Sequence, residues 1–138
     1  MTRDHQHRPP DVAVVFGNDP TAPKKARCAL QPLLSDPDDP IAEPVELVAS
    51  ELVSNVVEHT PDGGSVKAWD PKPDKPFHLE VTDSTRDEPT SPAEATEKGG
   101  RGLRIVEDLA DDWGVDHHPG DGKTVWADFN RPNHTTSG

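Results

Sequence analysis

Hydrophobic positions in the first half of the chain predict one strand followed by two helices. Residues 12–16 are an apolar run that ends at a Gly-Asn-Asp-Pro cluster, which is typical of a short strand and a turn. Residues 21–34 have a helical pattern that Pro32 should end or kink, because proline has no backbone N–H to donate. The clearest helix covers residues 43–59, where apolar residues recur at spacings of three and four: Val45, Val48, Leu52 and Val56.

A hairpin and a long polar loop follow the second helix. Residues 65–69 and 77–81 alternate as paired strands do, and no helix would tolerate the proline-rich connection between them. Residues 84–100 are rich in Ser, Thr, Pro and Glu and carry almost no apolar side chains. A loop of this length is usually either a functional lid or disordered. We therefore expect one of these two states for residues 84–100.

A third helix and a second hairpin complete the pattern. Helical periodicity returns over residues 101–112, with Gly114 as the expected stop of this helix. Residues 113–116 and 124–129 predict the strands of a final hairpin. The strands come in runs and do not alternate strictly with helices. This order favours an α+β fold, a two-layer α/β sandwich in which helices cover one face of a mostly antiparallel sheet.

Length and composition narrow the class of protein. A chain of 138 residues fits one domain, which we expect over residues 11–130, with disordered tails at residues 1–10 and 131–138. A net charge of −12 argues against direct binding of nucleic acid, because no basic stripe is present to neutralise phosphates. The single cysteine, Cys28, excludes an internal disulfide, fits a reducing compartment and is expected to be buried on the first helix.

The sequence contains no signal for export or for a membrane span. Its N-terminal residues lack the apolar segment of a signal peptide. No apolar run approaches the roughly 20 residues that cross a bilayer as a helix. We therefore expect a cytoplasmic protein without a membrane partner.

The helix over residues 43–59 carries the first segment with candidate chemistry. Glu51, Asn55 and His59 are spaced four residues apart, so they line one helix face beside the apolar stripe. Asn55 offers a neutral oxygen that suits Mg²⁺. Glu51 is placed to orient or deprotonate a hydroxyl or water that attacks a γ-phosphate. The spacing alone also fits a solvated helix flank.

Two further segments carry candidate chemistry. Asp83 follows the strand pattern of residues 77–81 and would emerge at the edge of the sheet, where its carboxylate can accept a hydrogen bond from the exocyclic amine of adenine. An aspartate that starts a turn is the alternative. Gly100, Arg101 and Gly102 lead into the third helix, where glycines permit close backbone approach and the helix N-terminus favours phosphate. A junction that needs glycine only for its shape is the alternative there.

In combination, these segments resemble the GHKL ATPase superfamily, and most closely its anti-sigma-factor serine/threonine kinase-like branch. Residues 51–60 resemble the N box of that family, and residues 83–89 resemble a variant of its first glycine box. Residues 100–114 resemble the second glycine box, which is the most specific part of the match, and residues 122–126 resemble the closing strand.

The resemblance implies a Bergerat-type α/β sandwich that binds ATP with Mg²⁺ between the N-box helix and a mobile lid. In such a site Asn55 would hold Mg²⁺, Glu51 would serve as the catalytic base and Asp83 would hold adenine. The resemblance implies further nucleotide contacts at Gly100, Arg101, Gly102, Leu103 and Thr124. Of these residues, Thr124 would lie near adenine.

The same resemblance implies a protein kinase that acts in partner-switching control of transcription. Its substrate would be a serine or threonine of an anti-sigma-factor antagonist, and its second partner would be a sigma factor, touched by Arg27. Family members often form homodimers, so a homodimer is also expected. Thr85 stands where the branch carries glycine. The alternative function is therefore a nucleotide-binding or nucleotide-free interaction module without kinase activity.

Overall fold

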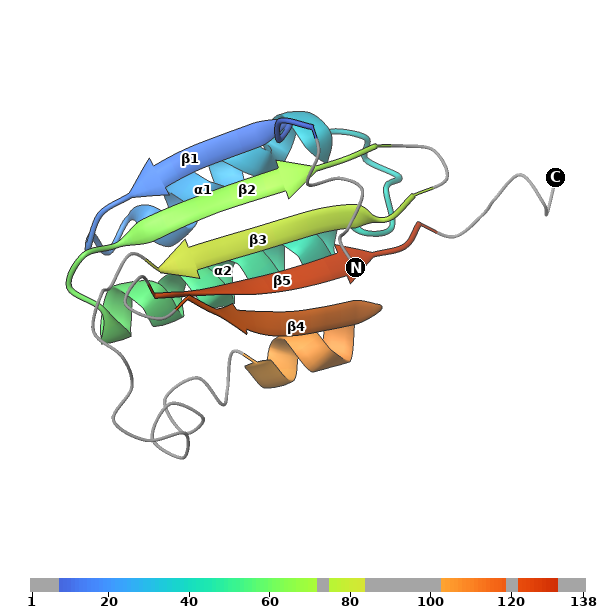
Figure 1. The fold of residues 1–138 in the computed structure, drawn as a ribbon. Helices are drawn as coiled ribbons and strands as arrows, with labels where there is room; N and C mark the ends of the chain where they lie inside the picture. Colours follow the sequence, from blue (N-terminus) through green and yellow to red (C-terminus); the bar gives the residue numbers. More distant parts are fainter. Residues whose placement is uncertain (1–7, 72–74, 84–102, 119–121, 132–138) are drawn as a thin grey trace, which may run out of the picture.

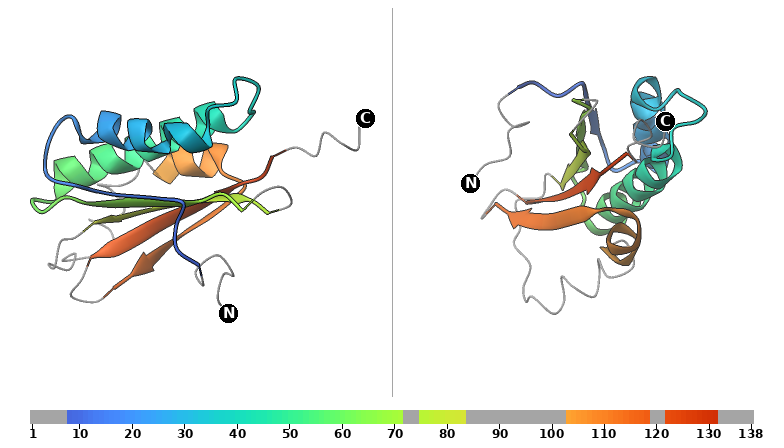
Figure 2. Two further views of the ribbon diagram at one scale, coloured as in Figure 1. Left: turned by 90° about the horizontal axis from the view of Figure 1, so that it is seen from above. Right: turned by 90° about the vertical axis from the view of Figure 1, so that its right-hand side faces the viewer.

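The computed structural model describes residues 8–71, 75–83, 103–118 and 122–131. Within these residues, five antiparallel strands form one sheet in the order β1-β2-β3-β5-β4, with helices on one of its faces (Figures 1 and 2). The predicted α+β layer is confirmed. The strands are β1 Val12–Phe16, β2 Gly64–Trp69, β3 Phe77–Asp83, β4 Asp112–His117 and β5 Lys123–Phe129.

The helical layer consists of α1 Ala22–Leu30, α2 Ala42–His59 and a helix at residues 103–109. α1 is followed directly by a 3-10 turn, η2 Gln31–Leu33, because Pro32 has no backbone N–H and cannot continue the α-helical hydrogen bonds. The apolar stripe of α2 faces the sheet, and its core members are Val45, Val48, Leu52, Val53 and Val56. None of the helices in the described part of the chain is long and apolar enough to cross a membrane.

A row of valines crosses the whole sheet on the helix-bearing face. The strand registers pair one valine from each strand with the next, in the order Val14, Val66, Val81, Val125 and Val115. The three central members are buried, and the two outer ones pack against the same core. β-branched side chains suit this position because they pack well on a pleated surface. The valine row therefore fixes which residues of each strand face the helices.

The opposite face of the sheet carries a buried histidine between two tryptophans. His78 is fully buried, and its ring stacks on Trp126 with centroids 5.9 Å apart and lies 5.5 Å from the ring of Trp69. The indole of Trp69 donates a 2.9 Å hydrogen bond to the carbonyl of Arg8. The described end of the predicted N-terminal tail is thus attached to this face.

The predictions that Gly114 stops the third helix and that Cys28 is buried on the first helix are wrong. Gly114 does not stop a helix; it lies inside β4 opposite Trp126, and a Cβ at this position would come within 2.7 Å of the indole ring. Residue 114 is therefore glycine because an aromatic ring occupies the space of its side chain. Cys28 is exposed on α1, because it points away from the buried stripe formed by Ala22, Ala26 and Leu30.

Arg131, which the sequence assigns to a disordered tail, is held by two carboxylates. Its guanidinium contacts Asp39 in the loop between the helices and Asp70 just after β2, each at 2.9 Å. Both carboxylates are nearly buried, with side chains 5% and 1% exposed. Residues 132–138 lie outside the described residues. This Arg131 clamp therefore ties the end of the described chain to two distant segments.

Candidate functional site

The second half of α2 presents a polar row at the edge of the core. Glu51 and Asn55 are half-buried beside the buried Leu52 and Val56, and His59 is exposed at the end of the helix. Among the described residues, neither Glu51 nor Asn55 forms a side-chain hydrogen bond or ion pair. The carboxylate and the amide are therefore available to a ligand.

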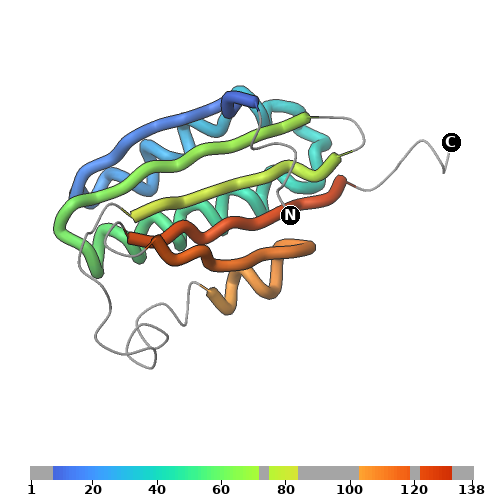
Figure 3. The backbone as a smooth tube through the Cα atoms, viewed as in Figure 1, coloured from blue at the N-terminus to red at the C-terminus, as the bar shows by residue number. Residues whose placement is uncertain are grey.

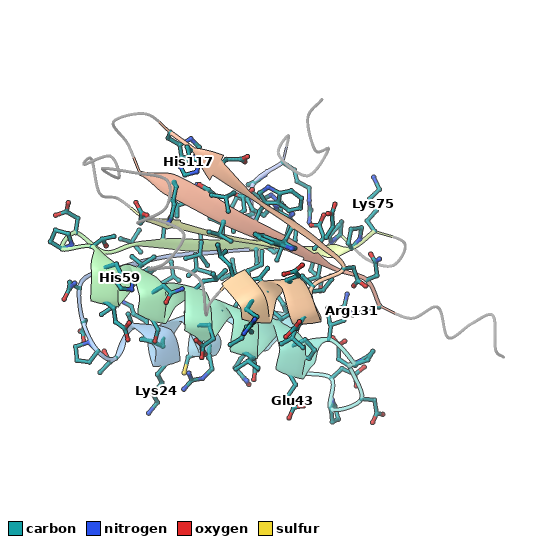
Figure 4. The ribbon with its side chains drawn as sticks, turned by 90° about the horizontal axis from the view of Figure 1, so that it is seen from below. Lys24, Glu43, His59, Lys75, His117 and Arg131 are labelled. Atoms are coloured by element: carbon teal, nitrogen blue, oxygen red, sulfur yellow. The ribbon has the colours of Figure 1, made fainter. Side chains whose placement is uncertain are left out.

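Asp83 lies at the same end of the molecule as the end of α2. It is the last residue of β3 and pairs with Gly64, the first residue of β2, which follows α2 after a link of residues 60–63. Asp83 alternates in phase with Val81, so its side chain is on the helix-bearing face, and it is only 6% exposed. The end of α2, the end of β3 and the start of β5 lie together in Figures 3 and 4, and the labelled His59 marks this end in Figure 4.

Local contacts hold this end of α2 against the sheet. The side-chain amide of Asn18, in the turn after β1, donates to the carbonyls of Val57 at 2.8 Å and Thr60 at 2.6 Å. These bonds satisfy carbonyls that a helix end otherwise leaves without partners. Gly63 has a φ of 75°, and a Cβ there would lie 2.2 Å from the carbonyl oxygen of Phe16. Only glycine therefore allows the link to pass so close to β1.

Thr124 does not share a face with Asp83. Its hydroxyl lies 2.7 Å from the hydroxyl of Thr82, with which it pairs directly across β3 and β5, and 3.0 Å from His118 Nε2. Because successive strand residues point to opposite faces, Thr82 and Thr124 face away from the helices while Asp83 faces them. The side chain of Thr124 therefore lies on the face of the sheet that carries no helices.

Lys123, the neighbour of Thr124 in the chain, lies on the helix-bearing face. It alternates in phase with Val125 and Ala127, which belong to the core. It pairs with His117 of β4, which also lies at this end of the sheet in Figure 4. Counting in twos from Val125 would have placed Lys123 on this face from the sequence alone.

The remaining candidate residues are only partly described. Gly100, Arg101 and Gly102 lie outside the described residues, as do Thr85 and the loop over residues 84–100. Leu103 is half-buried at the start of the described part of the third helix and packs against the core. This helix lies on the same face of the sheet as α1 and α2 (Figure 2).

Arg27 lies in the interface between the two long helices. It is half-buried on α1, and its Nη1 donates a 2.9 Å hydrogen bond to the hydroxyl of Ser50 on α2. Ser50 directly precedes Glu51 in the chain. Any contact that draws Arg27 outward would therefore act on the turn of α2 that holds Glu51.

The side chains at this end of the molecule suit a magnesium nucleotide. Asp83 is an acceptor that can select an amine, while Asn55 offers the kind of oxygen ligand that Mg²⁺ takes alongside phosphate oxygens and waters. Among the described residues, no group of three or more His, Cys, Asp or Glu is arranged to hold a metal. A hollow beside Arg131, at the opposite end, includes none of these residues.

Comparison with known proteins agrees with this arrangement. A family model described as the histidine kinase-like ATPase domain matches residues 16–129. A comparison with the curated proteins finds no match. The matched segment contains β2 to β5, all the described helices and the last residue of β1, Phe16.

Proposed function

The chain belongs to the histidine kinase-like ATPase family, and from this premise we propose that it binds ATP with Mg²⁺ and transfers the γ-phosphate to a serine or threonine of a partner protein. The observation that carries this proposal is the position of Asp83, a nearly buried carboxylate on the helix-bearing face, at the end of the sheet where α2 ends. A carboxylate at this position can accept a hydrogen bond from a ring amine. Adenine offers an amine to it, and guanine has a carbonyl oxygen instead.

The roles of α2 follow from its polar row. Bound Mg²⁺ would neutralise charge on the phosphates, and Asn55 would supply a protein oxygen to it. Glu51, one turn earlier, would accept the proton of the attacking hydroxyl as its oxygen bonds to the γ-phosphorus and ADP leaves. Positioning of these groups and electrostatic stabilisation would supply most of the rate of phosphoryl transfer.

The partners are proposed from the same family branch. We infer an anti-sigma-factor antagonist as the phosphate acceptor and a sigma factor as the protein that is held or released, in a cytoplasmic switch that controls transcription. Arg27 is the residue we expect at the sigma-factor surface. Its bond to Ser50 supports a link between that surface and the turn of α2 before Asn55.

A thermal-shift series tests nucleotide binding first. ATP with Mg²⁺ at about 100 times its Kd should raise the free energy of unfolding by about 2.7 kcal/mol, and GTP should raise it less. Asp83→Ala should weaken ATP binding about 5- to 150-fold, because it leaves the adenine amine without its acceptor. The matched control is Asp38→Ala, which removes an exposed aspartate at the far end of the molecule. Equal stabilisation of the Asp83 and Asp38 variants by ATP would refute the assignment of Asp83.

Labelled ATP then tests the chemistry. Incubation with γ-labelled ATP and the candidate antagonist should label the antagonist, and Glu51→Gln should abolish this transfer while ATP still binds. The second candidate function, an interaction module without kinase activity, is favoured by Thr85. It predicts that no label is transferred and that Glu51→Gln captures the partner as the native protein does.

A further inference from the structure

Lys123 stands next to Asp83 on the helix-bearing face of the sheet. The last residues of β3 and β5 that pair at this end are Thr82 and Thr124, so the next positions along the two strands are Asp83 and Lys123. Side chains at directly opposite positions of antiparallel strands have Cβ atoms about 4.5–5.5 Å apart. The carboxylate and the lysine stem are therefore neighbours.

This pair lies in the last cross-strand row at this end of the sheet. Gly64 lies beside Asp83 and contributes no side chain, and His117 lies beside Lys123. The next helix-facing row inward consists of the five valines described above. A flat ring that rests on apolar side chains at this end would therefore meet Asp83 and Lys123 with its polar edge.

The ammonium of Lys123 is available to a ligand. Lys123 is half-buried, and it forms no side-chain hydrogen bond or ion pair in the part of the chain that the structure describes. Its four-carbon stem can pack along the valines while its charged end reaches outward. A lysine held beside an aspartate in this way offers one donor next to one acceptor.

We propose that Lys123 is a specificity-determining residue that donates a hydrogen bond to N1 of the adenine ring. This inference rests on the proposed function, in which Asp83 accepts from the exocyclic amine. Adenine presents that amine and the N1 acceptor side by side, which is the pattern that a carboxylate and an ammonium complement. Hypoxanthine and guanine present a carbonyl oxygen and an N1–H donor in the reverse order, so they would place like groups against each side chain.

Two nucleotides and one substitution test the role of Lys123. Wild-type protein should bind ATP about tenfold or more tightly than 1-deaza-ATP, which lacks the N1 acceptor, because a hydrogen bond to a charged donor is among the stronger ones. Lys123→Met keeps the stem but removes the donor. In this variant ATP should bind about tenfold or more weakly, and the preference for ATP over 1-deaza-ATP should disappear.

Control variants separate the possible failures. Lys67→Met removes an exposed lysine from the other face of the sheet and should bind both nucleotides as wild type does. Lys123→Arg retains a donor and should keep part of the preference. The inference is overturned if Lys123→Met binds ATP like wild type, or if its preference for ATP over 1-deaza-ATP persists. Absence of ATP binding to wild-type protein would instead overturn the proposed function, and the inference with it.

Discussion

His78 Nδ1 lies 2.5 Å from Asp128 Oδ1 in the middle of the sheet face that carries no helices. The other ring nitrogen lies 2.9 Å from a carboxylate oxygen of Glu80, so the ring meets an acceptor on each side. Burial alone would lower the pKa of His78, but the hydrogen bonds and charges of Asp128 and Glu80 outweigh it and raise the pKa above its usual value. A protonated ring can donate to both carboxylates at once.

This cluster makes stability depend on pH with a definite sign. Because the pKa of His78 is raised in the folded protein, its contribution is fully present below the unfolded value of 6.5 and is lost as pH rises through the folded value. We expect the difference in unfolding free energy between wild type and His78→Gln to shrink as pH is raised from about 6 to about 9. Urea denaturation at several pH values measures it. Parallel curves for the two proteins would contradict this assignment.

The Arg131 clamp should contribute strongly to stability. Arg131→Met leaves two nearly buried carboxylates, Asp39 and Asp70, without their shared cation. We expect a loss of about 3 kcal/mol in the free energy of unfolding, measured by denaturant titration. The surface pair of Arg8 and Asp11 gives the comparison, since its side chains are 44% and 32% exposed. Arg8→Met should lower the free energy of unfolding by less than about 1 kcal/mol. Equal losses in Arg131→Met and Arg8→Met would show that burial does not determine the strength of these ion pairs.

Glycine at position 64 should be essential to the sheet end that carries Asp83. A Cβ there would lie 2.0 Å from the carbonyl oxygen of Thr82, so Gly64→Ala must push β2 and β3 apart. We expect a loss of about 2 kcal/mol or more, together with weaker ATP binding. Gly17→Ala is the matched control, because no atom lies within 4 Å of a Cβ built at Gly17. It should change stability by less than about 0.5 kcal/mol.

Thr124 should matter for stability and not for nucleotide affinity. Thr124→Val keeps the shape of the side chain but removes the hydroxyl that bonds Thr82 and His118. We expect a loss of about 1 kcal/mol in the free energy of unfolding and an unchanged Kd for ATP. Calorimetric titration measures the Kd for ATP of this variant. A large loss of affinity would contradict the prediction and would support a contact between Thr124 and adenine.

Periodicity in the sequence was sufficient to predict the elements, because strands and helices bury their apolar residues at different spacings. It also placed Glu51 and Asn55 on one face of α2. The relation between Thr124, Lys123 and Asp83 needed the register between β3 and β5, which a motif match does not contain. Reading Gly114 as a helix stop failed for a similar reason, since the ring that excludes its Cβ comes from a neighbouring strand.

Contacts between distant segments were beyond sequence reasoning. Arg131 meets carboxylates 61 and 92 positions earlier in the chain. His78 meets Asp128 across 50 positions. Such pairs become visible only when the sheet order is known, because no local pattern records which strands are neighbours.

The spacing of two residues between Val81 and Asp83 limits which insertions and deletions β3 can accept. Both residues face the helices because they are two positions apart on one strand. Deleting or inserting a single residue between them would turn the carboxylate toward the opposite side, even if the rest of the domain still folded. An odd-numbered length change inside β3 should therefore abolish base recognition, whereas changes in the connection before it should be neutral to that recognition.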